Sequence, residues 1–259
     1  MARADERHND LIRREFTRQL PIFADKDSYF ARANDATLAW LQPLSSDMVA
    51  LDVACGAAHA TEVCAPHVRQ VVGVDLTRAL LQAGAQRLQE RGMHNVLLQV
   101  GDAADLPFLD ESFDLVFCRF AVHHFADPPR QIAEMARVCR RGGRVVISDM
   151  VAPAAEQRVG FDDLHRLLDP SHARALPSDE LTQLTETLVG PIIRSDISTA
   201  TTPLALERMI NPSSDRVAVL AALRRELDGG PATGFMPSLG ADGALQAAFS
   251  SMVVHATRS

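Results

Sequence analysis

Residues 49–60 read Val-Ala-Leu-Asp-Val-Ala-Cys-Gly-Ala-Ala-His-Ala, an apolar strand-like run that ends in a turn of small side chains. Small side chains let a ligand approach the backbone closely, and a helix that follows such a turn offers backbone N–H groups at its first turn. This arrangement is typical of ligand-binding turns in doubly wound α/β folds. The stretch therefore predicts the first strand, a binding turn and the start of a helix.

Apolar, β-rich runs alternate with helix-length intervals on the C-terminal side of this stretch. The predicted strands are 48–54, 71–75, 96–100, 114–119 and 145–149, with helices over 77–91 and 128–141. Buried strands separated by helices favour a parallel sheet covered on both faces. After Met150 the pattern predicts helices at 155–168 and 178–188, a strand at 192–199, further helices within 203–227 and an alternating strand at 248–256.

We expect a single domain made of three parts. Residues 1–30 form an N-terminal helical cover, whose helix over about 4–20 carries Ile12, Phe16, Gln19 and Phe23 on one stripe and is interrupted by Pro21. Residues 31–151 form the α/β core. Residues 152–259 form a helical lid together with the last two strands of the sheet. Ligands of doubly wound sheets bind at the carboxyl ends of the strands, where such a lid would cover them.

Composition narrows the class of protein. The chain has 259 residues, of which 47% are hydrophobic and 23% charged, as in an ordinary globular protein. A net charge of -7 and an aromatic content of 5% give a nucleic acid little to bind, so no nucleic-acid partner is expected. The polar N-terminal residues and the absence of a long apolar run predict a cytoplasmic protein with no membrane segment. The four cysteines are scattered and predict reduced thiols, and we assign no metal site.

Carboxylates follow the first three predicted strands or lie within them. Asp52 belongs to the first strand, Asp75 ends the second and lies nineteen residues beyond Gly56, and Asp102 follows the third. A carboxylate at the end of the second strand is the group with which doubly wound folds hold ribose hydroxyls. Carboxyl ends of parallel strands share one edge of a sheet, so these three side chains are expected to meet there.

The ordered series of motifs resembles a known family. Together with the segments 110–116, 120–125 and 137–144, the motifs from Met48 to Asp149 are similar to those of class I S-adenosylmethionine-dependent methyltransferases, in the subgroup that includes the ubiquinone/menaquinone C-methyltransferases and many small-molecule methyltransferases. The resemblance implies a seven-stranded, mostly parallel sheet whose last strand is antiparallel, and S-adenosyl-L-methionine as cofactor. Where the family turn usually carries glycines, this chain has Ala54 and Ala58.

The resemblance also implies roles for individual residues. Asp75 is expected to accept hydrogen bonds from both ribose hydroxyls, Asp102 and the Ala103 N–H to contact the adenine edge, and Leu76 and Leu106 to cover the adenine faces. Arg119 and Phe120 are expected near the sulfonium. The implied cofactor contacts are, in chain order, Asp52, Ala54, Cys55, Gly56, Asp75, Leu76, Asp102, Ala103, Arg119 and Phe120.

The acceptor side of the site is less defined by the sequence. His123 and His124 are candidate catalytic residues, either as a general base or by orienting the acceptor, with a packing role as the alternative. Phe16, Tyr29 and His165 are candidate substrate contacts. Asp162, His165 and Asp169 share one face of a predicted helix, for which a solvated face, a substrate contact and a metal site are the three interpretations.

These observations predict transfer of a methyl group from S-adenosylmethionine to a small-molecule acceptor, by a monomer or homodimer, with acceptor choice set by the lid. One alternative is a protein that binds S-adenosylmethionine or S-adenosylhomocysteine without methyl transfer. A second alternative is a nicotinamide-dependent oxidoreductase, which would require a G-x-G-x-x-G turn that this chain lacks.

Overall fold

The centre of the protein is a seven-stranded sheet with the strand order β3-β2-β1-β4-β5-β10-β6. A computed structural model describes residues 2–24, 34–152, 157–199, 204–205 and 209–259. The strands are β1 (Val49–Val53), β2 (Gln70–Asp75), β3 (Val96–Val100), β4 (Phe113–Arg119), β5 (Cys139–Met150), β6 (Ile192–Thr199) and β10 (Ser250–Thr257). Strands β1 to β5 pair in parallel, whereas β10 lies antiparallel between β5 and β6. The predicted α/β fold with an antiparallel last strand is confirmed.

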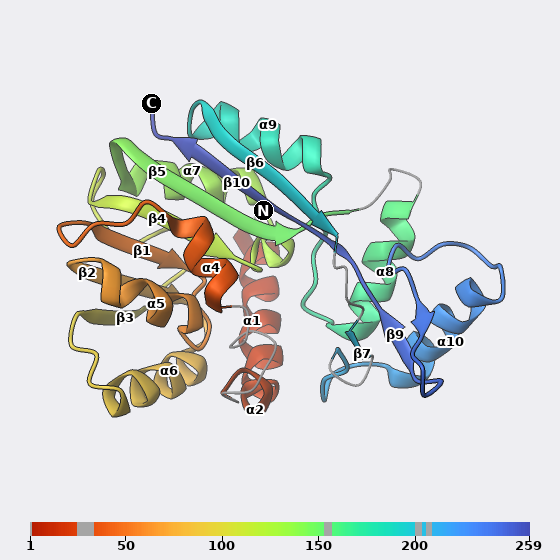
Figure 1. The fold of residues 1–259 in the computed structure, drawn as a ribbon. Coiled ribbons are helices and arrows are strands. Elements are labelled where there is room, and N and C mark those ends of the chain that lie inside the picture. The colour runs from red at the N-terminus through yellow and green to blue at the C-terminus, as the bar shows by residue number, and fades with distance from the viewer. Residues whose placement is uncertain (1, 25–33, 153–156, 200–203, 206–208) are drawn as a thin grey trace.

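Helices cover both faces of this sheet (Figure 1). The helices of this part are α1 (Ala2–Arg18), α2 (Leu20–Ala24), α4 (Asn34–Leu41), α5 (His59–Cys64), α6 (Arg78–Glu90), α7 (Pro128–Val138) and α9 (Ser178–Leu188). Helices α5 and α6 connect β1, β2 and β3 on one face, while α7 and α9 pack on the other. Crossovers between parallel strands are right-handed. From β1 the chain adds β2 and β3 on one side and then β4 and β5 on the other, so the helices that connect these two sets of strands lie on opposite faces of the sheet.

The side chains of β4 show how the sheet separates two hydrophobic cores. Leu115 and Phe117 belong to the cluster under α4 and α5, whereas Val116 and Cys118 belong to the cluster under α7 and α9. Successive side chains of a strand point to opposite faces, so an uninterrupted apolar strand supplies both cores. All four side chains are at most 2% exposed.

A third hydrophobic cluster joins the lid elements at one end of the sheet (Figure 1). It lies among α8 (Arg158–Leu168), α10 (Arg216–Leu227) and a small sheet of the order β7-β9-β8, formed by Leu204–Ala205, Leu245–Ala247 and Ser238–Leu239. The rings of Phe161 and Phe235 stack at a centroid distance of 4.6 Å in this cluster. Met150 and Ala152 also belong to it, so the end of β5 anchors the lid.

Two sequence predictions are wrong in detail, and one small sheet was missed. The helix predicted over 128–141 ends at Val138, because Cys139 already pairs with Phe113 and the strand β5 begins there. The helical region predicted from residue 203 becomes the strand β7 and then α10, which begins at Arg216 after Asp215 caps it by accepting a hydrogen bond from Ala218 N. The small sheet was missed because strands of two or three residues are too short to show alternation.

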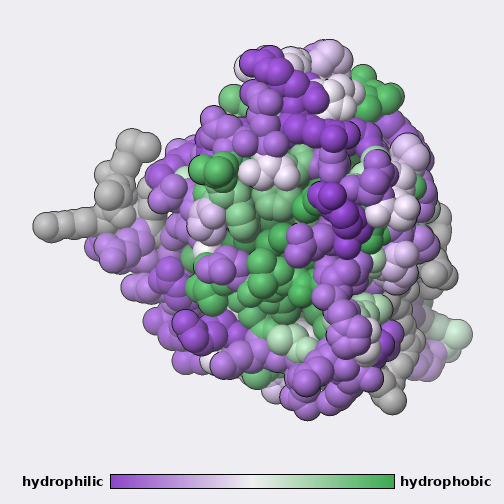
Figure 2. Space-filling view, turned by 90° about the vertical axis from the view of Figure 1, so that its left-hand side faces the viewer, coloured by the Kyte–Doolittle hydropathy of each residue, from purple (hydrophilic) through white to green (hydrophobic). Residues whose placement is uncertain are grey.

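Figure 2 shows the face of the molecule that lies away from α8 and α10. Hydrophobic side chains gather in a hollow at its centre, and hydrophilic side chains surround them. Within the part of the chain that the structure describes, no helix has both the length and the apolar character needed to cross a membrane.

Candidate functional site

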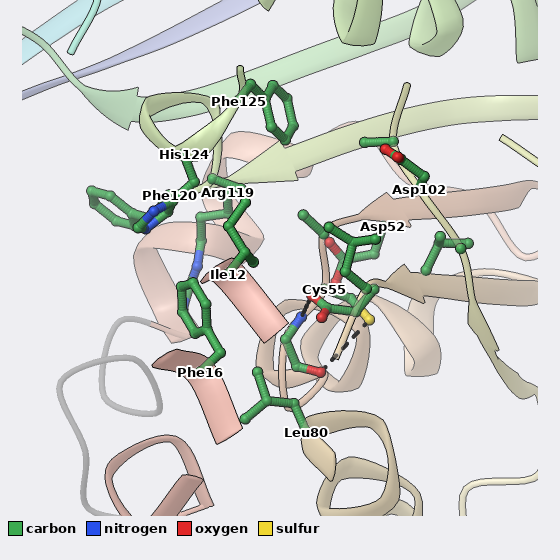
Figure 3. A pocket seen from close by; sticks show the side chains of 18 of the residues that line it. Ile12, Phe16, Asp52, Cys55, Leu80, Asp102, Arg119, Phe120, His124 and Phe125 are labelled. Atoms are coloured by element: carbon green, nitrogen blue, oxygen red, sulfur yellow. Dashed lines mark hydrogen bonds between the residues drawn. The ribbon is translucent and has the colours of Figure 1, made fainter. Parts of the chain in front are cut away.

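A first cavity lies at the carboxyl ends of β1, β2 and β4, under helix α1 (Figure 3). Ile12 and Phe16 of α1 face Asp52 and Cys55 across it. All ten residues for which the sequence implied a cofactor contact line this cavity, from Asp52 to Phe120. Leu106 lies in the hydrophobic core and is absent from the lining, where Val74 and Leu80 are present instead.

The turn after β1 adopts a left-handed backbone at three positions. The φ angles are 57° at Ala54, 56° at Gly56 and 62° at Ala58. This region costs an alanine roughly 1–2 kcal/mol and a glycine almost nothing. The turn therefore keeps the backbone shape that glycines favour, although alanine occupies two of the three positions. Gly56 N donates a hydrogen bond to Asp75 Oδ2 at 2.8 Å, which ties the turn to the end of β2.

Replacing Ala54 with glycine should raise the free energy of unfolding by about 0.5–1 kcal/mol, because relief of the left-handed alanine outweighs the entropy that glycine adds to the unfolded chain. Urea denaturation measures this change. The matched control is Ala85→Gly, at an exposed site inside α6, which should lower stability by about 0.8–1 kcal/mol.

Asp75 is a buried carboxylate that lines the first cavity. Its Oδ1 accepts a hydrogen bond from Thr77 N at 2.7 Å and its Oδ2 accepts the bond from Gly56 N. Burial raises the pKa of this carboxyl, and the two backbone donors oppose the rise. Each carboxylate oxygen has two lone pairs, so both can still accept a hydrogen bond from a ligand.

Asp52 is a second buried carboxylate, 1% exposed, that lines the same cavity. Its Oδ2 accepts a hydrogen bond from the Thr61 hydroxyl at 2.6 Å. Burial raises the pKa of Asp52 to about 7, against the lowering effects of Thr61 and of the positive charge of Arg119. Asp52 therefore changes charge near neutral pH at the wall of the cavity.

Asp102 connects the end of β3 to helix α1. Its Oδ2 accepts a hydrogen bond from Asn9 Nδ2 at 2.7 Å, and its Oδ1 accepts one from Ala104 N at 2.8 Å. Sequence reasoning missed Asn9. The signal was present in the spacing of Asn9, Ile12 and Phe16, which places all three on one helix face.

A second cavity lies beside the first, between helix α1 and the lid. Four residues line both cavities, which therefore adjoin each other: Phe16, Phe23, Phe120 and His124. The rings of Phe16 and His124 meet edge to face at 5.0 Å. Phe120 has a positive φ of 50°, and its backbone N donates to Ser148 O at 2.7 Å. The shared lining thus combines residues of α1 and α2 with the segment that follows β4.

The two adjacent histidines after β4 have different partners. His124 Nδ1 lies 3.0 Å from Ser171 O, and because a carbonyl can only accept, Nδ1 is the donor of this hydrogen bond. His123 Nδ1 lies 2.6 Å from Asp149 Oδ1, and Asp149 also accepts from Met150 N and His123 N. Burial lowers the pKa of His123 well below its ordinary value and raises the pKa of Asp149 to about 7.

The polar face of α8 is buried, so its interpretation as a solvated face is wrong. Asp162 is 7% exposed and Asp169 9% exposed. Asp162 Oδ1 accepts hydrogen bonds from His172 Nε2 at 2.7 Å and Ala175 N at 2.8 Å. Burial would raise the pKa of Asp162, but these bonds hold it below its ordinary value. Asp169 lines the second cavity with His165, and its Oδ2 accepts from Gln19 Nε2.

The structure thus divides the predicted site residues between two cavities. Phe16 and His124 line both, His123 and His165 line only the second, and Tyr29 lies outside the described residues. Residues that the sequence analysis did not assign to the second cavity are Gln19, Ile22, Met150, Leu168, Met209, Asn211 and Phe249. They come from five separate segments of the chain, and no local pattern connects them.

Comparison with known proteins places the chain in a family. Residues 51–147 match the model of a methyltransferase domain. The uncharacterized methyltransferase YcgJ of Bacillus subtilis is 41% identical over 125 residues, which are 48% of this chain and 49% of YcgJ. The demethylmenaquinone methyltransferase of Anoxybacillus flavithermus is 37% identical over 45% of this chain and 49% of its own length. In these two sequence matches the chain spans about half the length of its relative.

Two further similarities extend over more of the chain. The uncharacterized protein YafE of Escherichia coli is 30% identical over 162 residues, which are 62% of this chain and 77% of YafE. The crystal structure of YcgJ superimposes with a TM-score of 0.73 and 25% identity, covering 88% of this chain and 99% of YcgJ. The matched domain holds β1 to β5 and the turn beneath the first cavity. The chain is a member of the class I S-adenosylmethionine-dependent methyltransferases.

Proposed function

We propose that this protein binds S-adenosylmethionine in the first cavity and transfers its methyl group to a small-molecule acceptor in the second. The observation that carries the proposal is the shared lining: Phe16, Phe23, Phe120 and His124 line both cavities. Two ligands in cavities that share lining residues lie next to each other, and holding two reactants together removes much of the entropic barrier to their reaction.

The residues of the first cavity fit this cofactor. Asp75 is buried at the end of β2. Each of its oxygens accepts one backbone hydrogen bond and has a further lone pair that can accept a hydrogen bond from a ribose hydroxyl. Asp52 adds a carboxylate that suits the positively charged methionine portion of the ligand, and Asp102 adds one that suits the adenine edge. Apolar side chains such as Leu76 and Leu80 complete the surface on which an adenine can lie. When bound, the cofactor supplies a methyl group that its sulfonium has already activated.

The protein's own part is to orient the acceptor, exclude water and receive a proton. Helix α1 covers both cavities, held by the bond from Asn9 to Asp102 and by a hydrogen bond between His8 Nε2 and His124 O at 2.8 Å. His124 lines both cavities, and its Nε2, when unprotonated, would accept the proton that the acceptor loses on methylation. His124 is therefore our proposed general base, and His123 and His165 line the acceptor cavity.

The raised pKa of Asp52 predicts the pH dependence of cofactor binding. A positively charged ligand favours the ionised carboxylate, so binding should release a proton where Asp52 is protonated in the free protein. Because that pKa is about 7, affinity should fall as the pH drops below 7, approaching tenfold per pH unit. Calorimetric titration between pH 5.5 and 8.5 measures this slope. In Asp52→Asn the slope should flatten, whereas Asp163→Asn, at an exposed site of α8, should keep it.

Without ligand, the contribution of Asp52 to the free energy of unfolding should change with pH in the opposite direction to cofactor affinity. Between the ordinary pKa of 3.8 and the raised value of about 7, the folded state binds more protons at Asp52 than the unfolded state does. The contribution of Asp52 to the free energy of unfolding therefore falls as the pH rises through this range. Urea denaturation without ligand, in wild type and Asp52→Asn, isolates that contribution.

Parallel calorimetric titrations with S-adenosylmethionine, S-adenosylhomocysteine and NAD test the proposed function. We expect both sulfur ligands to bind with one site per chain and NAD to bind far more weakly. Tighter binding of NAD would favour the oxidoreductase alternative. Release of S-adenosylhomocysteine in the presence of phenolic and enolic acceptors then tests transfer, and binding of S-adenosylmethionine without release from any acceptor would favour a binding protein.

A further inference from the structure

Three histidines from separate segments meet beside the second cavity. His123 follows β4, His165 lies on α8, and His172 lies in the loop after α8. One ring nitrogen of each lies within 4.8 Å of those of the other two. The rings of His165 and His172 stack at 4.2 Å, and each lies 5.6 Å from the ring of His123. His123 and His165 line the cavity, and His172 lies outside its lining.

In two of these rings, a hydrogen bond to a buried carboxylate determines which nitrogen carries the lone pair. Asp149 accepts three hydrogen bonds, one of them from His123 Nδ1, so His123 Nε2 is the nitrogen without a proton. Asp162 accepts from His172 Nε2, so the lone pair of His172 lies on Nδ1. A carboxylate behind the distal nitrogen is the arrangement that orients histidine ligands in metal sites and raises their basicity.

Two nitrogens of the cluster lack a hydrogen-bond partner. Among the described residues, neither His165 Nδ1 nor His172 Nδ1 has one, and both atoms are buried. A buried polar atom without a partner costs about 1–3 kcal/mol, so such atoms usually have a ligand or a water molecule. Neutral imidazole is the form that coordinates a metal.

We propose that His123, His165 and His172 bind a divalent first-row transition metal ion, with zinc as the expected ion, and that Asp149 and Asp162 are positioning residues for the site. Three histidines with one open position form a ligand set of catalytic zinc. Tetrahedral ligands at 2.0–2.1 Å from zinc lie roughly 3.3 Å apart. The rings, whose nitrogens are up to 4.8 Å apart here, therefore turn towards the ion when it binds.

The open position of the site faces the second cavity, because His123 and His165 contribute to its wall. This step rests on the proposed function: the fourth ligand is an oxygen of the methyl acceptor. Binding to the ion lowers the pKa of a hydroxyl and stabilises the oxyanion. The geometry thus favours an acceptor with an ionisable oxygen, such as a phenol or an enol, over an acceptor that offers only an amine.

Metal binding by the full-length chain tests the site independently of methyl transfer. Chelator-treated, dialysed protein is titrated with Zn²⁺ and, separately, with Co²⁺, whose visible absorption reports a tetrahedral site. We expect one ion per chain. His165→Ala and His172→Ala should each weaken binding by at least a hundredfold. Asp162→Asn should weaken it by about 10- to 100-fold, since it disturbs only the support of His172. His94→Ala, at an exposed histidine elsewhere, should change nothing.

Zn²⁺ should also raise the melting temperature of the wild type and of His94→Ala, but not that of His165→Ala. Equal affinity in wild type and His165→Ala, or no stoichiometric ion in the wild type, overturns the proposal. If the alanine variants fail to fold, Asp162→Asn, which keeps the side-chain volume, decides the question: unchanged affinity refutes the site. S-adenosylmethionine binding is measured on the same samples, so a protein that binds the ion but not the cofactor contradicts the proposed function and leaves the metal site standing.

Discussion

Asp75→Ala should weaken S-adenosylmethionine binding by at least tenfold, the largest loss expected from a single change in the first cavity. Hydrogen bonds to a charged acceptor contribute roughly 1.5–3 kcal/mol each, and one such bond to a ribose hydroxyl already exceeds the 1.4 kcal/mol that a tenfold change requires. The substitution also frees Gly56 N and Thr77 N, whose bonds to Asp75 hold the turn in place. Calorimetric titration measures the loss, and circular dichroism checks the fold.

Two control variants separate the carboxylate from general damage. Asp75→Asn keeps the volume and one acceptor oxygen, so it should retain part of the affinity that alanine loses. Asp163→Ala removes an exposed carboxylate of α8 and should bind the cofactor as the wild type does. A folded Asp75→Ala variant with unchanged affinity would contradict the placement of the ribose at the end of β2.

Gly84→Val should lower the free energy of unfolding by about 2–3 kcal/mol, the largest effect expected on stability. A Cβ at Gly84 would lie 2.8 Å from Ala57 O and 3.1 Å from Ala58 Cβ, so α6 and the binding turn cannot keep their present distance. Backbone atoms cannot move aside as a flexible side chain can, and overpacking costs typically 1–3 kcal/mol. Because the turn lines the first cavity, cofactor affinity should fall with it, by about tenfold or more.

Ala85→Val provides the matched control for this prediction. Ala85 is the next residue of α6 and is exposed, so the change costs only helix propensity, below about 0.7 kcal/mol. Urea denaturation compares the two variants under identical conditions. Equal stability of Gly84→Val and wild type would show that the close approach between α6 and the turn does not constrain position 84.

The parallel core of this fold was predictable because its signals are local. A continuous apolar run indicates a strand buried on both faces, and a carboxylate directly after it marks the edge where ligands bind. Asp52, Asp75 and Asp102 reach one cavity for this reason. The edge strand 192–199 and the helix 178–188 were also predicted with the observed bounds, since each shows its own periodicity.

The acceptor side was not predictable because its contacts are long-range. The carboxylates of α8 have the spacing of a solvated helix face, and only the fold reveals that Asp162 bonds to His172 and Asp169 to Ser171. The histidine cluster joins positions on both sides of β5, with none of the short spacings by which metal sites are recognised in a sequence. The sequence analysis assigned no metal site because it relied on sequence spacing. Our proposal of a metal site relies instead on the distances between the three histidines in the folded protein.

The position of β10 has a consequence for synthesis of the chain. Among the strands that the structure describes, β6 joins the sheet only through β10, which is synthesised after all of the elements from α8 to β9. About 100 residues separate Met150 at the end of β5 from Ser250 at the start of β10, so at typical elongation rates the delay is on the order of 5–20 s. During this interval the edge of β5 has no neighbouring strand on that side, and an open edge is a template for pairing with another nascent chain. Slowing translation before residues 250–257 should therefore lower the yield of folded protein, and chaperones that shield strand edges should restore it.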